Sequence, residues 1–411
     1  MKIRLDRFTI TKPQKADLTK LIICILFFSL NLSAQNTIRG RILDADRVPI
    51  DYATVYVNGT TTGAVTDEGG TFEFAASNFP CELVISHLNY KTFSYRLVSK
   101  PEQGLNIILE PQNYEIDSIV VVVKGNRAEN MRIFKDNFLG RSPFNNKATI
   151  LNEDQIVFER KYETDSLLVD KTVPAWREKY ATFKNDITWS QDSSEIYYQT
   201  ATRLFARCKS PLQVLVPSLG YSILYDLQQF TCGFRKNGIG VEQCFYFGYS
   251  FFKETKDSKR VRRLRNKAYY NSSQHFCRSL YHNTLASNGY QLLCNNDSGS
   301  LIPADLSTHI SYEGNVARIT GSEYNDFYIL YHTKMNGDIL DLTKSKPSQD
   351  PTQSQLFLNS DTCLFTNKGI IPNNDMAFSQ AIANKKIGSM LPIDFEPYGN
   401  DDSNPIFLLA P

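Results

Sequence analysis

Residues 37–110 consist of short strand-like segments separated by turns, and this pattern constrains the fold more than any other feature. Segments such as Ala53–Val57 and Thr71–Phe74 alternate apolar and polar side chains, as half-buried strands do. Between them, Asp44–Pro49 and Thr66–Gly70 are rich in Asp, Gly and Pro, which favour turns. Strands spaced about 8–12 residues apart, with no helical stretch between them, predict a small β-sandwich.

Glycines, aspartates and β-forming residues recur at defined positions through this region. They are Gly40, Asp44, Pro49, Ile50, Ala53, Thr54, Val55, Gly59, Thr60, Gly63, Thr66, Asp67, Gly70 and Phe72, followed by the turn Ser86–Lys91. The pattern resembles the carboxypeptidase-like regulatory domain. The resemblance implies a transthyretin-like (prealbumin-like) Greek-key sandwich of seven strands, abundant in exported Bacteroidetes proteins, where it often precedes outer-membrane receptors. Arg47 stands where that family usually has glycine, which suggests a reshaped turn.

The N-terminus has the pattern of an export signal. Basic residues between Lys2 and Lys20 precede an apolar run, Leu21–Leu32, and small residues follow at Ser33 and Ala34. We interpret residues 1–34 as a signal peptide cleaved near Ala34; a buried strand or helix is the alternative. A run of about a dozen residues is short for a bilayer span, so we expect no transmembrane helix in the mature chain.

Removal of this segment changes the charge balance of the chain. Six basic and two acidic residues leave with it, so the net charge falls from +2 to −2. An exported protein with this charge is a poor candidate for binding nucleic acid. The export signal, together with the resemblance above, implies a protein of the periplasm or the outer-membrane surface.

Export also permits disulfides. Seven cysteines would remain in the mature chain: Cys81, Cys208, Cys232, Cys244, Cys277, Cys294 and Cys363. Cys232 and Cys244 flank the glycine-rich stretch Gly233–Gly240, a spacing that would allow them to face each other across a hairpin. Most of the seven are expected to be buried free thiols.

The whole chain is predicted to be mainly β, with four successive regions. The signal peptide (1–34) and the sandwich (35–112) are followed by a linker strand and helix (113–140). A larger β-rich α+β domain with a helical insert near 258–288 occupies residues 141–411. In the linker, Ile116–Val123 is expected to be a strand, and a helix is expected to begin after Asn126 and end at Gly140.

The remainder of the chain also carries a resemblance. The segments Phe138–Gly140, Pro211–Leu212, Leu219–Tyr221, Arg265–Tyr269, His275–Phe276 and Leu391–Pro397 are similar to the C-terminal region of many exported Bacteroidetes proteins that contain the same regulatory-like domain. The stretch 165–200 fits that resemblance least and is interpreted as an insertion. The resemblance implies an envelope location and no particular reaction.

One segment of the remainder is strongly basic. It contains Lys253, Lys256, Lys259, Arg260, Arg262, Arg263, Arg265 and Lys267, and its only acids are Glu254 and Asp257. Ser258 is expected to cap a helix with Val261, Leu264 and Ala268 turned inward. We select Lys259, Arg260, Arg262, Arg263, Arg265 and Lys267 as candidates for binding an anion or an acidic partner. The alternative is a solvated helix face.

The segment Phe245–Phe252 contains six aromatic side chains and allows two interpretations. It would form a sugar-stacking strip or a strand buried on both faces, and we favour the buried strand.

Residues with catalytic or metal-binding spacing are not evident. His275 and His282 are seven residues apart, about 10.5 Å along a helix, which is too far for one metal ion. None of the five histidines precedes a glutamate with the spacing of a zinc carboxypeptidase, and serine-hydrolase and nucleotide-binding motifs are incomplete. We assign no catalytic, cofactor-binding or metal residues.

The sequence thus predicts a non-enzymatic exported envelope protein that binds or scaffolds another envelope protein or a glycan. One alternative is an accessory component of a TonB-dependent outer-membrane uptake system. Another is an envelope peptidase or glycoside hydrolase whose carboxylates the sequence does not single out.

Overall fold

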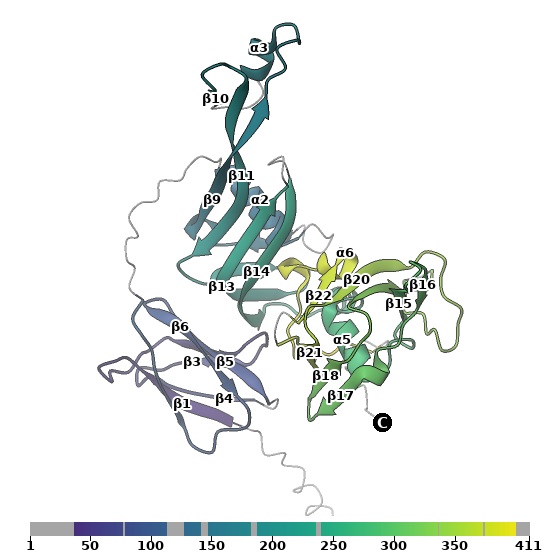
Figure 1. The fold of residues 1–411 in the computed structure, drawn as a ribbon. Helices are drawn as coiled ribbons and strands as arrows, with labels where there is room; N and C mark the ends of the chain where they lie inside the picture. The colour runs from purple at the N-terminus through teal and green to yellow at the C-terminus, as the bar shows by residue number, and fades with distance from the viewer. Residues whose placement is uncertain are drawn as a thin grey trace, which may run out of the picture.

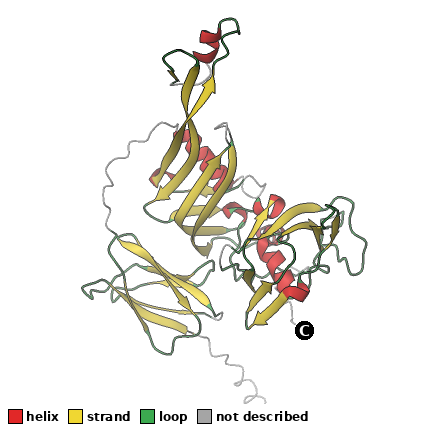
Figure 2. Cartoon of the chain, in the orientation of Figure 1, coloured by secondary structure: helices red, strands yellow, loops and turns green. Residues whose placement is uncertain are grey.

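The computed structural model describes residues 37–76, 79–112, 127–140, 147–181, 187–235, 240–335, 337–372 and 375–399. As predicted, the fold is mainly β (Figures 1 and 2). The expected signal peptide, the expected strand Ile116–Val123 and the expected cap Asn126 lie outside the described residues. The described residues form three hydrophobic cores: one in the sandwich, one beneath a long-stranded central sheet, and one in the C-terminal part.

The first part is a two-sheet sandwich. One sheet has the order β4 (Thr71–Ala75), β1 (Thr37–Leu43), β7 (Leu105–Ile108), and the other has the order β3 (Gly63–Val65), β2 (Thr54–Val57), β5 (Cys81–His87), β6 (Tyr90–Leu97). Alternate residues of these strands, such as Val55, Leu83 and Ile85, fill the core between the sheets. The prediction of a β-sandwich here is confirmed.

The turn at Arg47 differs from the expectation of a reshaped loop. Arg47 itself adopts the left-handed conformation that glycine would supply, with φ of 62°. The Asp44 carboxylate accepts hydrogen bonds from the backbone N–H groups of Asp46 and Val48, which holds the turn in this shape.

The second part is built on a central sheet. Its strands are β8 (Thr149–Ile150), β9 (Ile156–Leu168), β10 (Thr188–Trp189), β11 (Glu195–Cys208), β12 (Leu212–Val216), β13 (Tyr221–Phe234) and β14 (Val241–Glu254), with a 3₁₀ turn η2 (Glu153–Gln155). Helix α2 (Arg127–Phe138) packs Phe134 and Phe138 into the core, and Phe134 lies 4.6 Å from the ring of Phe230. Gly140, with φ of 87°, follows the end of the helix as predicted.

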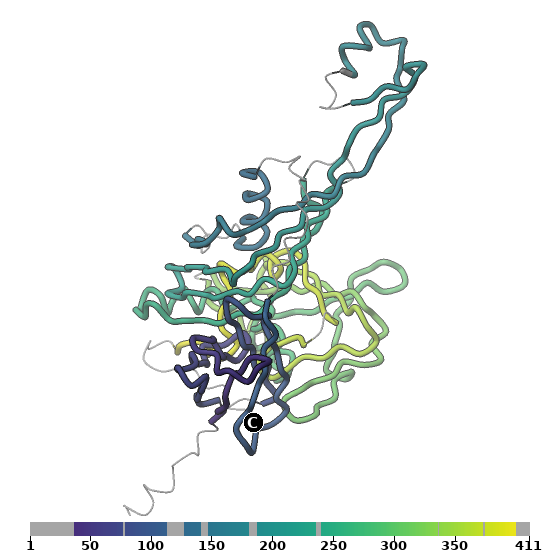
Figure 3. Tube along the Cα trace, turned by 90° about the vertical axis from the view of Figure 1, so that its left-hand side faces the viewer, coloured from purple at the N-terminus to yellow at the C-terminus, as the bar shows by residue number. Residues whose placement is uncertain are grey.

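A two-stranded arm extends from this sheet (Figures 1 and 3). Strands β9 and β11 pair along their whole length, whereas β11 meets β13 only around Arg203–Phe205. The arm carries β10 and helix α3 (Trp176–Ala181) at its tip. It contains most of the stretch 165–200 that we interpreted as an insertion.

Cys232 and Cys244 face each other on β13 and β14 and form a disulfide. The hairpin that the sequence suggested therefore exists. Five further cysteines in the described residues are free: Cys81, Cys208, Cys277, Cys294 and Cys363.

Two helices connect the central sheet to the C-terminal part. They are α4 (Lys259–Tyr269) and α5 (Ser273–Tyr281). Ser258 caps α4 by accepting a hydrogen bond from the Val261 N–H, as predicted. Ser272 caps α5 by accepting a hydrogen bond from the His275 N–H, and Asn271 lies in the left-handed region with φ of 58°.

The third part contains two further sheets around its own core. One sheet has the order β16 (Leu301–Pro303), β15 (Tyr290–Asn295), β19 (Asp326–Tyr331), β20 (Thr352–Leu358), β22 (Met376–Ser379), and the other has β17 (Ile310–Glu313), β18 (Val316–Thr320), β21 (Thr362–Thr366). Short helical segments are η3 (Ser307–His309), α6 (Gln380–Ala383) and η4 (Ile387–Ser389). Residues 141–411, expected as one domain, are thus divided between two cores.

The segment 391–398 links all three parts, and we call it the junction segment. Leu391 and Phe395 insert into the core beneath the central sheet. The Ile393 N–H donates to the Gly59 carbonyl of the sandwich at 2.6 Å. Arg278 of α5 donates to the Ile393 carbonyl at 2.8 Å. One short segment thereby fastens the sandwich and the C-terminal part to the central sheet.

Candidate functional site

Helix α4 carries the six residues that the sequence selected for anion binding, and the structure separates them into two groups. Val261 and Ala268 face the protein interior, as predicted. Arg265, four residues after Val261, lies on the same side of the helix, because side chains four apart share a face. Arg260, Arg263 and Lys267, spaced three and four residues apart, occupy the opposite side.

Arg265 is completely buried, so its selection as a surface anion-binding residue was wrong. Its guanidinium donates to the carbonyls of Leu219 and Lys256 at 2.8 and 3.1 Å. It also donates to the Glu254 carboxylate at 3.0 Å and the Tyr398 hydroxyl at 3.1 Å. The Cζ atom of its guanidinium lies 4.1 Å from the centre of the Tyr221 ring. Arg265 therefore holds β14, the following loop and the junction segment together.

Arg262 is also occupied by partners within the molecule. Its Nε donates to Asp257 at 2.9 Å, and its guanidinium lies over the ring of Tyr398 at 5.3 Å. The hydrogen bond from Arg262 lowers the pKa of the Asp257 carboxyl. Arg262 and Arg265 thus form ion pairs with Asp257 and Glu254, the two acidic residues of the basic segment.

Four of the six candidates remain exposed: Lys259, Arg260, Arg263 and Lys267. Lys253 and Lys256, just before the helix, are exposed as well. Within the described part of the chain, Arg260, Arg263 and Lys267 form no ion pair. Lys259, Arg260, Arg263 and Lys267 form a surface that we call the exposed cationic face of α4, and Arg262 and Arg265 bind the two acids of the same segment.

Lys385 anchors the opposite end of the same helix. Its ammonium donates to the carbonyls of Ala268, at 2.8 Å, and of Tyr270. A cation in this position satisfies carbonyls that the end of a helix leaves unpaired. Burial lowers the pKa of Lys385 to about 7. This role of Lys385 could not be predicted from local sequence, because the contact joins positions more than 110 residues apart.

A groove of about 300 Å³ lies where the sandwich meets the C-terminal part. Its lining comes from Val57, Asn58, Thr60, Phe79–Glu82, Arg96, Asn315, Val316, Thr366–Lys368, Ile370, Pro372, Ile393 and Asp394. The charged groups in it are largely paired: Glu82 accepts from Asn58 at 2.9 Å, and Lys368 donates to Glu396 at 2.9 Å. Sequence reasoning missed this groove because six separated segments form it.

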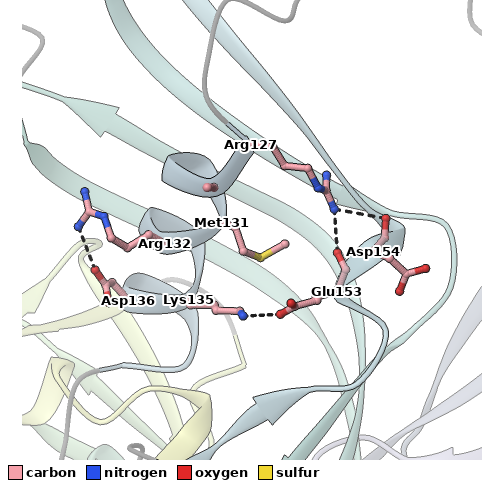
Figure 4. Close-up of a pocket in the computed structure, with 8 residues that line it drawn as sticks. Arg127, Met131, Arg132, Lys135, Asp136, Glu153 and Asp154 are labelled. Atoms are coloured by element: carbon pink, nitrogen blue, oxygen red, sulfur yellow. Dashed lines mark hydrogen bonds and ion pairs between the residues drawn. The ribbon is translucent and has the colours of Figure 1, made fainter.

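A second depression lies beside helix α2 and is lined mainly by charged residues (Figure 4). Lys135 pairs with Glu153, and Arg132 pairs with Asp136. Arg127 donates to the carbonyl of Glu153 at 3.0 Å. The contacts of Arg127 and Lys135 with Glu153 hold the turn η2, which precedes β9, against the helix. The charged side chains around this depression therefore have a structural role.

The histidines that the sequence considered for a metal site occupy structural positions. His275 is buried in the first turn of α5, and its Nδ1 lies 2.9 Å from the Tyr290 hydroxyl. Burial lowers the pKa of His275 to about 3, so its ring is neutral at physiological pH. His282 is the residue after the end of α5. Within the described ranges, no group of three His, Cys, Asp or Glu side chains is arranged to hold a metal ion.

The aromatic run on β14 corrects the prediction of a strand buried on both faces. Tyr246 and Phe252 pack into the core, but Phe245 and Phe247 on the opposite face are 42% and 48% exposed. Farther along that face, Phe251 packs against Tyr56 of the sandwich, with ring centres 5.1 Å apart. The sandwich therefore covers only one end of the aromatic row.

Polar contacts complete this interface between the sandwich and the central sheet. Thr92 of β6 donates to the Asp226 carboxylate, and the Tyr249 hydroxyl donates to Ser94 at 3.1 Å. Burial raises the pKa of Asp226. The sandwich is thus docked through specific contacts as well as apolar area.

Among the described residues, none of the helices is long and apolar enough to cross a membrane.

Comparison with known proteins assigns the first part of the chain. Residues 38–121 match the model of the CarboxypepD_reg-like domain. The chain is 30% identical over 111 residues to the TonB-dependent receptor SusC of Bacteroides thetaiotaomicron, which is 27% of this chain and 11% of the receptor. It is 30% identical over 107 residues to a TonB-dependent receptor of Formosa agariphila, covering 25% of this chain and 10% of that receptor. The chain therefore spans about a tenth of the length of the curated relatives it matches.

Proposed function

We propose that this chain is a non-enzymatic exported envelope protein that binds an acidic envelope protein through the exposed cationic face of α4. As a finer part of the proposal, it acts as an accessory of a TonB-dependent outer-membrane uptake system. The similarity of the regulatory-like domain to two TonB-dependent receptors supports this context.

The observation that carries the proposal is the pairing within the basic segment. Arg262 and Arg265 bind Asp257 and Glu254, so the segment's own acids do not neutralise the outward cations. Arg260, Arg263 and Lys267 project from one side of a helix that is capped at both ends. Fixed cations on one face favour an acidic surface and speed its capture, because both charge and geometry are preset.

Two further features support export and a binding role. The Cys232–Cys244 disulfide is of the kind that persists in oxidising compartments such as the periplasm. The most strongly perturbed titratable groups, such as His275, Cys277 and Tyr290, are core residues with packing roles. Their perturbation follows from burial and does not require a catalytic role.

Site-specific cross-linking tests the proposal. A photoreactive amino acid would replace Arg263 on α4 in the native host, and the control would carry it at Lys334, an exposed lysine in the C-terminal part. We expect one envelope protein to be cross-linked from position 263 and not from position 334. Equal products from both positions, or products that are only glycan, would overturn the proposed protein partner. Turnover by the purified chain that disappears on mutating particular carboxylates would overturn the non-enzymatic role.

A further inference from the structure

The two long outer strands of the central sheet, β9 and β14, have very different free edges. Strand β9 pairs only with β11, and its other edge has no described strand beside it. Strand β14 pairs with β13 on one side. On its other side, the sandwich loop at Gly59 and Thr60 occupies only the stretch near Ser250–Phe252.

That loop extends the sheet by backbone pairing. The Gly59 N–H donates to the Ser250 carbonyl at 2.7 Å, and the Phe252 N–H donates to the Thr60 carbonyl at 2.9 Å. These β14 groups point away from β13, toward an added strand. Farther along the same edge, the backbone groups of residues 243–249 bond to no described strand other than β13. A template for strand addition therefore continues beyond the loop.

The chemistry of the two edges is opposite. Between Glu159 and Asp165, β9 carries five charged side chains, which is how proteins commonly discourage unwanted pairing at an open edge. Between Gln243 and Tyr249, β14 carries none. Instead, Phe245 and Phe247 expose almost half of their surface beside that edge. An open, uncharged and aromatic edge is typical of a surface that a partner covers.

We propose that the edge of β14 at residues 243–249 binds an extended, uncharged segment of a partner protein as an added β-strand. The new strand would continue the pairing that Gly59 and Thr60 begin. Its alternate apolar side chains would lie beside Phe245 and Phe247, on the face where Phe251 already packs against Tyr56. This site is separate from the exposed cationic face of α4 and does not depend on the function proposed for that face.

The test uses defined probes: synthetic 12-residue peptides that tile the envelope proteins of the host. They would be screened against the purified chain and against the double variant Phe245→Lys/Phe247→Lys. The matched control is Val157→Lys, at an exposed position (57%) on the charged strand β9. We expect at least one peptide to bind the chain and the control equally, and to bind the double variant at least about tenfold more weakly.

Amide hydrogen exchange distinguishes strand addition from other kinds of contact. Bound peptide should slow exchange along residues 243–249 and leave β9 unchanged, and N-methylation of alternate peptide residues should abolish binding. Thermal unfolding of each variant shows that the fold persists. Binding without protection of β14, or unaffected by Phe245→Lys/Phe247→Lys, would overturn the proposal. Concentration-dependent self-association lost in the double variant would overturn it in favour of a second copy of this chain. Reversing charges on α4 should leave peptide binding intact.

Discussion

Two groups of cations from neighbouring helices have contrasting environments. Arg265 and Arg278 are buried and hold the junction segment, whereas Arg260 and Arg263 project into solvent. Arg278 donates to Glu396 at 3.1 Å, to the Ile393 carbonyl and to the Lys368 carbonyl. Residue type is the same in both groups. The side of the helix decides whether the arginine organises the fold or faces a partner.

The buried group should dominate stability. Replacing Arg265 by alanine would leave the Leu219 and Lys256 carbonyls unpaired and remove the partner of Glu254. We expect a loss of about 3–5 kcal/mol in the free energy of unfolding, measured by urea denaturation. The matched variant Arg263→Ala, two residues away, should lose less than about 0.5 kcal/mol. Similar losses in the two variants would contradict the distinction between the groups.

A substitution at Gly59 tests the contact between the sandwich and the junction segment, which the buried arginines hold in place. Its φ is 74°, and a Cβ atom there would lie 2.3 Å from the Ile393 side chain. Gly59→Ala should therefore cost about 1–3 kcal/mol and loosen the sandwich from the junction segment. Faster proteolysis between the sandwich and α2 would report the loosening. The control Gly104→Ala, where the nearest atom is 3.8 Å away and φ is ordinary, should behave like the parent chain.

His275 shows that the interior near these arginines excludes a further charge. Burial lowers the pKa of His275 to about 3, and the nearby Lys385 and Arg278 contribute in the same direction. The unfolded chain therefore binds this proton at higher pH than the folded chain does. Stability should fall as pH decreases from about 6.5 to about 3, by up to roughly 1.4 kcal/mol per pH unit from this group. Denaturation across this range should show a shallower slope for His275→Gln. An unchanged slope would show that other groups control the acid sensitivity.

Local sequence patterns predicted the elements whose signals lie within a few residues. The sandwich strands, the end of α2 at Gly140, the Ser258 cap and the Cys232–Cys244 pair are of this kind. Helical spacing also contained the information that Arg265 faces inward with Val261, although its charge suggested a surface role. A charged residue on an apolar stripe is a signal of a buried, fully paired cation.

Other features depend on contacts between distant segments and could not be found this way. The groove between the sandwich and the C-terminal part brings residues around Val57 beside residues around Asp394. The exposure of Phe245 and Phe247 depends on how far the sandwich extends over β14, which strand alternation alone does not specify. The pairing of Lys385 with the end of α4 likewise depends on a contact between segments that are distant in the sequence.

The most direct test of the central claim measures partner capture and stability in the same preparations. The variant Arg260→Glu/Lys267→Glu reverses two charges on the exposed cationic face of α4 and leaves position 263 for the photoreactive residue. The control Lys334→Glu/Lys346→Glu makes the same net change at exposed lysines in the C-terminal part. We predict that the α4 variant unfolds within about 0.5 kcal/mol of the parent but recovers at least about tenfold less of the cross-linked envelope protein, while the control recovers it fully. Full recovery by the α4 variant would contradict the account.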